Sequence, residues 1–283
     1  MVLPQLRLLA ATLALVCSIP WPARAAQGPA TVSVAPGTLV RWSAPGTQRC
    51  RMSTRSWPAL NETCYYPVDL LQKPGLIKIT RWGRTGPGES ARISVEPFAY
   101  PTQEIDLGDI PQANPSAADL RRDAREQVLL SKVWARKEGP AKFTLPLGAP
   151  LSPLPEGGAF GSKRIFNGKP AAQPHTGADY AAPAGSPVLA VADGTVALAQ
   201  ELFFPGNAVF IDHGAGLISM YFHLSGIKVK AGQEVQKGHV VGVVGTTGRS
   251  TGPHLFFGVR WHDARIGPRY VLEDPATIPA VGQ

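Results

Sequence analysis

The sequence predicts an all-β protein of two β-domains joined by one α-helix. Three observations predict this class: short segments alternate apolar and polar residues, glycine (30) and proline (28) are abundant, and only one segment, residues 116–134, has helical spacing. The hydrophobic content of 44% is enough for a packed core. No internal stretch approaches the ~20 apolar residues that span a bilayer, so we expect no transmembrane anchor.

The first 25 residues have the pattern of a secretory signal peptide. A positive start and an apolar run over residues 8–19 precede the small-x-small cleavage pattern Ala23–Ala25. The alternative is a lipoprotein modified at Cys17, which Val16 disfavours because a small residue is usual at that place. We therefore expect a bacterial protein that is periplasmic or secreted and that loses residues 1–25.

The charge of the mature chain is modestly basic. Removal of Arg7 and Arg24 with the signal takes away no acid, so the formal net charge falls from +8 to +6. This charge suits an anionic partner such as cell wall or a membrane surface, and it serves solubility equally well. No basic run with interleaved aromatic residues is present, so nucleic acid is not an expected partner.

A small β-domain is expected over residues 26–110. Its strands are predicted at Thr31–Val34, Leu39–Trp42, Leu76–Trp82 and Ala91–Val95. Two cysteines remain there in an oxidising compartment, which predicts a Cys50–Cys64 disulfide that closes a loop of about 15 residues and stabilises by about 3 kcal/mol. A metal-binding cysteine pair is the disfavoured alternative, because the domain contains no histidine.

A linker with one helix is expected over residues 111–142. Ser116 can cap the helix, Asp119 completes a capping box, and Gly139-Pro140 ends it. Apolar residues near helical spacing are Leu120, Ala124, Val128, Val133 and Trp134. The helix is interpreted as a connection packed on a domain, with partner binding as the alternative.

The remaining chain is expected to form an antiparallel β-domain over residues 143–272, followed by a tail over 273–283. Predicted strands are Pro187–Ala192, Ala208–Asp212, Leu217–His223, Val240–Val244 and Leu255–Trp261. Asp193-Gly194 predicts a hairpin between the first of these and the segment from Val196 onward. A glycine-containing turn at His213–Gly216 joins the next two strands.

Four polar residues of this domain are candidates for chemistry: His175, Asp179, His223 and His254. Imidazole and carboxylate are common zinc ligands, but a His and an Asp four residues apart are weak evidence by themselves. Ordinary polar burial is the alternative. The context strengthens the metal hypothesis, because His223 ends one predicted strand and His254 opens another after the glycine-rich run Gly242–Gly248.

About 130 residues of this region resemble the lysostaphin-type (LytM-like) zinc murein endopeptidases. The matching motifs, in order, are Phe160-Gly161, Arg164–Gly168, His175–Asp179, Ala182–Val188, Asp193-Gly194, Gly206-Asn207, Asp212–Gly214, Tyr221–Ser225 and Ser250–His254. The expected fold of residues 143–272 is accordingly an antiparallel β-sandwich or barrel-sandwich hybrid. The resemblance implies zinc as cofactor and peptidoglycan as partner.

The resemblance also implies roles for single residues. His175 and Asp179 match the first two zinc ligands, whereas His223 and His254 match non-ligand histidines that deprotonate the zinc-bound water and stabilise the tetrahedral intermediate. The family's third zinc ligand is the second histidine of a His-x-His motif. In this chain that position is Phe256.

Phe256 argues against zinc occupancy. Residues 254 and 256 of a strand point to one face, so the phenyl ring is expected where an imidazole would reach the metal. It has no lone pair, and two protein ligands fall below the usual catalytic complement of three. The other histidines of the domain, His213, His239 and His262, are not expected to replace the ligand.

Three hypotheses for function follow, and the sequence leaves open whether the chain is an enzyme. The first is an exported peptidoglycan-acting relative with impaired or lost zinc catalysis and a regulatory or wall-binding role, because some family members that lack site residues activate a cell-wall amidase. The second is an active zinc endopeptidase that hydrolyses peptide crosslinks of peptidoglycan. The third is an extracellular binding module whose N-terminal β-domain contacts a partner.

Overall fold

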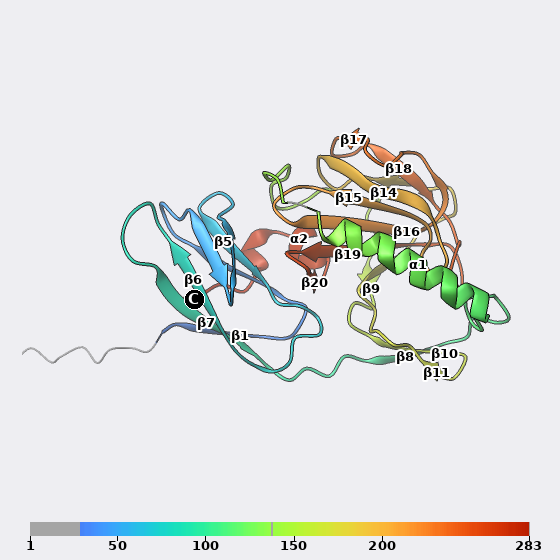
Figure 1. Cartoon of the computed structure of the whole chain (residues 1–283), viewed down its shortest axis with the longest axis horizontal. Helices are drawn as coiled ribbons and strands as arrows, with labels where there is room; N and C mark the ends of the chain where they lie inside the picture. Colours follow the sequence, from blue (N-terminus) through green and yellow to red (C-terminus); the bar gives the residue numbers. More distant parts are fainter. Residues whose placement is uncertain (1–28, 137, 283) are drawn as a thin grey trace, which may run out of the picture.

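The computed structural model describes residues 29–136 and 138–282 and confirms the predicted fold class (Figure 1). The predicted signal peptide lies outside these residues. Strands dominate, and the helices are α1 (Ala117–Trp134), the short α2 (Arg269–Leu272) and a 3-10 turn at Pro275–Thr277. Over the described part of the chain, no helix is long and apolar enough to cross a membrane.

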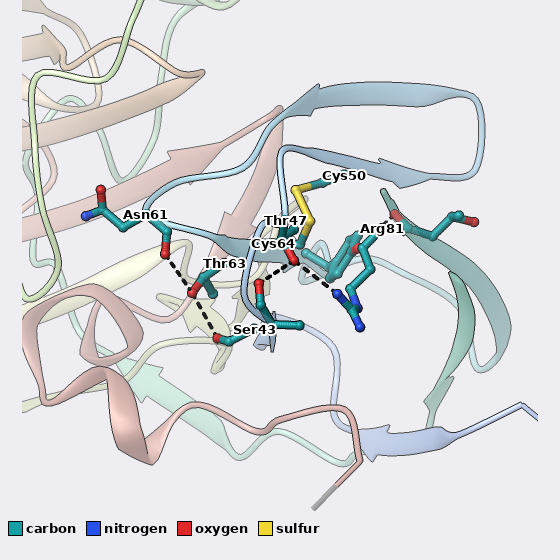
Figure 2. The surroundings of a disulfide bond; sticks show 10 residues. Ser43, Thr47, Cys50, Asn61, Thr63, Cys64 and Arg81 are labelled. Atoms are coloured by element: carbon teal, nitrogen blue, oxygen red, sulfur yellow. Dashed lines mark hydrogen bonds between the residues drawn. A yellow bond between two sulfur atoms is a disulfide. The ribbon is translucent and has the colours of Figure 1, made fainter. Parts of the chain in front are cut away.

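The N-terminal β-domain consists of a five-stranded and a two-stranded sheet. Its strands are β1 (Thr31–Val34), β2 (Leu39–Ser43), β3 (Arg49–Met52), β4 (Arg55–Pro58), β5 (Thr63–Pro67), β6 (Gly75–Trp82) and β7 (Glu89–Val95). The larger sheet has the order β1-β7-β6-β3-β4, and β2 pairs with β5. Cys50 on β3 and Cys64 on β5 form the predicted disulfide, which links the two sheets through the core (Figure 2).

The C-terminal residues of the described chain pack on this domain. Figure 1 shows the C-terminus beside β6 and β7. The last residues run along β2, where the Arg41 amide donates to the Pro279 carbonyl (2.9 Å) and the Val281 amide donates to the Arg41 carbonyl (3.0 Å). Asp69 adds a salt bridge to Arg265 of the C-terminal domain at 2.8 Å. The predicted tail is therefore an integral part of the packing between the two domains.

The C-terminal domain is built on a ten-stranded antiparallel sheet. Its main path runs β17-β14-β15-β16-β19-β12-β9, with β13, β18 and β20 paired to its side. The bounds are β9 (Gly157–Gly158), β12 (Gly177–Ala181), β13 (Pro187–Leu189), β14 (Gly194–Leu202), β15 (Gly206–Asp212), β16 (Leu217–Ile227), β17 (Glu234–Val235), β18 (Val240–Val244), β19 (His254–Trp261) and β20 (Ala264–Ile266). A separate small sheet joins β8 (Thr102–Ile105), β10 (Lys163–Phe166) and β11 (Lys169–Pro170).

Alternate residues of the central strands face two different clusters. Tyr221 and Phe257 point into the main core of the domain. Met220 and Phe256 point to the opposite face, where they join Leu130 of α1 in a second apolar cluster. The helix therefore covers part of the sheet face that carries the candidate site.

The hairpin predicted at Asp193-Gly194 is wrong. The short β13 pairs with β18, whereas β14 pairs with β15 and β17. Asp193 instead anchors two distant segments: its carboxylate accepts from the Lys237 amide (2.8 Å), and its carbonyl lies 2.7 Å from His213 Nδ1. The dipeptide marks a sharp change of direction, but it does not make the strands on either side partners.

Helix α1 has the predicted capping box, in which Ser116 and Asp119 satisfy each other's backbone amides. Val133 is buried, as the apolar pattern of the sequence predicts, but other positions differ from that pattern. Leu120 and Val128 are 52% and 59% exposed, whereas Glu126 is buried. The Glu126 carboxylate accepts from the Phe203 backbone amide at 2.8 Å, so a polar contact fixes the side of the helix that faces the sheet.

Candidate metal centre

Three neighbouring strands bring the candidate residues together on one face. Asp179 on β12 lies opposite Phe256 on β19, and Phe256 lies opposite Phe222 on β16. Directly opposed residues of antiparallel strands project to the same side of a sheet. The predicted residues His175, His223 and His254 lie just before β12, within β16 and at the start of β19.

Each of the three histidines is oriented by a backbone carbonyl. The Nδ1 atoms of His175, His223 and His254 lie 3.1, 2.9 and 2.9 Å from the carbonyls of Ala159, Thr247 and Gly252. A carbonyl only accepts, so each Nδ1 carries the proton and donates it. Each ring therefore has its lone pair on Nε2, on the side away from this hydrogen bond. A hydrogen bond at the other ring nitrogen commonly fixes the tautomer of a histidine that acts as a metal ligand or a base.

His223 occupies an irregular point of β16. Pairing with β19 stops at Phe222, and pairing with β18 begins at Leu224. His223 lies between them with φ of +63°, a conformation uncommon for a residue other than glycine, and its amide donates to the Pro205 carbonyl at 2.9 Å. Backbone strain of this kind concentrates at functional sites, where neighbouring structure holds it in place.

Asp179 is the charged centre of the site. Its Oδ2 accepts from Arg164 at 2.5 Å, and its Oδ1 lies 3.2 Å from His175 Nε2 and 3.6 Å from His254 Nε2. Burial opposes the charged carboxylate, but the contacts with His175 and Arg164 outweigh it and hold the pKa of Asp179 well below its usual range. Burial lowers the pKa of His175 and is the main cause that lowers the pKa of His223 to about 4, so both are neutral at pH 7.

Three atoms of this cluster have no hydrogen-bond partner although they are buried. One is the donor Arg164 Nε, and the other two are His175 Nε2 and Asp179 Oδ1. Both carry lone pairs when the imidazole is neutral and the carboxylate is charged, so two acceptors face each other at 3.2 Å. A proton or a cation between them would remove this conflict.

Phe256 fills the volume beside these two atoms. Its ring lies parallel to Phe222 with centroids 4.6 Å apart and meets the His175 ring edge to face at 5.1 Å. A Cβ atom on Gly177 would come within 2.6 Å of the Phe256 ring, so the glycine leaves the space that the ring occupies. Phe256 is 6% exposed and belongs to the apolar cluster under α1.

The residues present do not fit a three-ligand zinc site. His175 and Asp179 offer a nitrogen and an oxygen, but the next side chain on this face is a phenyl ring, and Arg164 already neutralises the carboxylate. Over the described part of the chain, no three His, Cys, Asp or Glu side chains are placed to share a metal. Catalytic zinc usually has three protein ligands and one open position.

The other three histidines lie outside this cluster. His213 is fully buried between the Asp193 carbonyl and the Ser219 hydroxyl, His262 contacts Glu138, and His239 is exposed. None of them takes the place of a third ligand beside His175 and Asp179.

Sequence reasoning assigned no role to Arg164, Phe222, Thr247 or Ser250. Arg164 pairs with Asp179, Phe222 stacks on Phe256, Thr247 holds His223, and Ser250 Oγ lies 3.3 Å from His254 Nδ1. The only available signal was that Arg164, Phe222 and Ser250 stand in the motif runs of the site and Thr247 in the glycine-rich run. Their partners lie on other strands and cannot be read from spacing.

The site thus consists of a His-x-x-x-Asp pair and two further histidines on adjacent strands of an antiparallel sheet. Comparison with known proteins identifies the class of this protein. The model of peptidase family M23 matches residues 173–268. A crystal structure from Pseudomonas aeruginosa, assigned to peptidase M23, is 33% identical, covers 84% of this chain and 94% of its own, and superposes with a TM-score of 0.64. The chain belongs to peptidase family M23, as the sequence motifs indicated.

Two curated relatives match about a third of this chain. The peptidoglycan DD-endopeptidase ShyA of Vibrio cholerae is 42% identical over 98 residues, which are 35% of this chain and 23% of ShyA. The DD-carboxypeptidase/endopeptidase Mpg of Neisseria meningitidis is 47% identical over 94 residues, which are 33% of this chain and 22% of Mpg. The chain thus spans less than a quarter of the length of these relatives.

Proposed function

We propose that the chain is an exported, peptidoglycan-binding member of family M23 whose zinc catalysis is impaired or lost. The observation that carries this proposal is the position of Phe256, opposite Asp179 and in edge contact with His175. In the family motif the same position holds the third zinc ligand. Replacement of a lone pair by a packed carbon ring removes one of three bonds to the metal.

Peptidoglycan is proposed as the partner because ShyA, which is 42% identical over 98 residues, is named a peptidoglycan DD-endopeptidase. The strands β12, β16 and β19 bring the three oriented histidines and Asp179 together, and we propose this face of the sheet as the peptide-binding face. The regulatory form of this proposal is activation of a cell-wall amidase, which the resemblance implies for family members that lack site residues. Export follows from the predicted signal peptide.

An active zinc endopeptidase is the second candidate, and one observation favours it. His175 Nε2 and Asp179 Oδ1 face each other without a hydrogen-bond partner, as two ligands of one cation would. In that case His223 and His254, oriented by the Thr247 and Gly252 carbonyls, would accept the proton of the attacking water and stabilise the charged intermediate.

Incubation of the mature chain, residues 26–283, with purified sacculi in zinc-containing buffer separates the two candidates. We expect the chain to sediment with the sacculi and to release no more peptide than a His175→Ala variant. Peptide release that a chelator and His175→Ala both abolish would establish the active endopeptidase instead. A chain that stays in the supernatant would contradict wall binding.

A further inference from the structure

The Arg249 guanidinium lies against two aromatic rings at the edge of the candidate site. Its central carbon is 4.2 Å from the Phe166 ring centroid and 4.7 Å from the Phe204 ring centroid. Phe166 ends β10, two residues after Arg164, and Phe204 follows β14. Contacts with two aromatic faces hold the flat guanidinium in one orientation and remove water from it.

Arg249 belongs to the loop that orients both strand histidines. Thr247, two residues earlier, accepts the Nδ1 proton of His223, and Ser250, the next residue, lies 3.3 Å from His254 Nδ1. The Arg249 amide donates to the Phe204 carbonyl at 2.9 Å, which fixes the loop against the turn after β14. The guanidinium is thus tied to the same wall of the site as the two histidines.

The charge of Arg249 has no partner among the residues that the structure describes. Within residues 29–136 and 138–282, no carboxylate lies within 4 Å of the Arg249 guanidinium and no group is hydrogen-bonded to it, whereas neighbouring Arg164 is paired with Asp179. Burial and the positive charge of Arg164 lower the pKa of Arg249 to about 10, and Asp123 of α1 offsets this only from a distance. A half-buried, unpaired cation costs free energy that a bound anion would recover.

We propose that Arg249 is a carboxylate anchor of the peptide-binding face. Its rigid fork of N–H donors matches a carboxylate in bidentate geometry, and the two rings hold the fork in place before a ligand arrives. The ligand class is therefore a peptide that presents a free carboxylate next to the bond lying over His175 and Asp179. This inference rests on the proposed binding of wall peptides and specifies what that binding recognises. The competing explanation is that Arg249 only packs the loop between Phe166 and Phe204.

The test uses the mature chain and soluble muropeptides cut from sacculi with a muramidase. One half of the preparation keeps its carboxylates, and the other half has them converted to amides with a carbodiimide and ammonia. Calorimetry gives the dissociation constant of each form for wild type, Arg249→Met, Arg249→Lys and Arg84→Met. Arg84→Met removes the same charge from an exposed position of the N-terminal domain.

We expect amidation to weaken binding to wild type and to Arg84→Met by about tenfold, which corresponds to about 1.4 kcal/mol. Arg249→Met is expected to bind both forms with the same weak affinity, and Arg249→Lys to keep part of the difference. The wild-type comparison needs no variant, so a misfolded Arg249→Met would not obscure the result. Equal binding of both forms by wild type would overturn the role of Arg249 and leave wall binding intact. Failure of wild type to bind either form would overturn both.

Discussion

The Phe256 ring is stacked on the Phe222 ring, with an angle of 3° between their planes and 4.6 Å between their centroids. The two residues are direct partners across β19 and β16. A histidine at position 256 would share the same strand geometry and face His175 and Asp179. In the proposed function, the aromatic stack is therefore the feature that separates this site from a three-ligand zinc site.

Phe256→His is expected to create zinc binding. The imidazole would add the missing nitrogen beside His175 and Asp179, and we expect about one zinc per chain after dialysis, measured by plasma mass spectrometry. Loss of the aromatic pair should lower the stability of the metal-free variant by about 1 kcal/mol. Phe256→Leu, which is apolar and has no lone pair, is the control and should bind no zinc. A metal-free Phe256→His protein would show that position 256 does not decide occupancy.

Glu126→Ala should loosen α1 from the sheet. The substitution leaves the Phe203 amide without its acceptor in a buried position, which should cost about 2 kcal/mol of unfolding free energy in urea titrations. Glu201→Ala is a matched control, because Glu201 contacts the same Arg122 while its side chain is 66% exposed. It should change stability by less than about 0.5 kcal/mol. Equal losses in the two variants would refute the anchoring role of Glu126.

The disulfide should make a measurable contribution to stability. Cys50 and Cys64 are 14 positions apart, and replacing both with alanine should lower the unfolding free energy by about 3 kcal/mol. Reductant should produce a similar loss in wild type and no further change in the double variant. A double variant as stable as wild type would show that the core of the N-terminal domain is sufficient without the crosslink.

Because of His213, the free energy of unfolding should decrease in acid. Burial lowers the pKa of His213 from the usual 6.5 to about 4. Between these pH values the imidazole is therefore protonated in the unfolded chain and neutral in the folded chain. Stability should therefore be complete above about pH 6.5 and fall by roughly 3 kcal/mol as the pH drops to 4. His213→Gln should be less stable at pH 7 and should lose less stability over that interval. Parallel pH curves for the two proteins would rule out this contribution.

The sequence predicted local features well. The strand boundaries Thr31–Val34 and Val240–Val244 match the structure residue for residue, and the capping box of α1 is formed. Each depends on residues close together in the chain, such as alternating side chains or a serine three positions before an aspartate. The predicted disulfide is also present, because only two cysteines remained to pair.

Features that depend on distant partners were missed. The Asp193-Gly194 signal could not show that β13 pairs with β18, about fifty residues later. Glu126 has no sequence mark of burial, because its acceptor role is set by the Phe203 amide on another element. The pairing of Arg164 with Asp179 depends likewise on how β10 and β12 are placed side by side.

The zinc content of the purified wild-type chain, residues 26–283, tests the central claim most directly. The protein should be dialysed against buffer with equimolar zinc, passed through a desalting column and analysed by plasma mass spectrometry, with Phe256→His in parallel. Two ligands and a phenyl ring predict far less than one zinc per chain in wild type and close to one in the variant. One chelator-removable zinc per wild-type chain, lost on His175→Ala, would contradict the account.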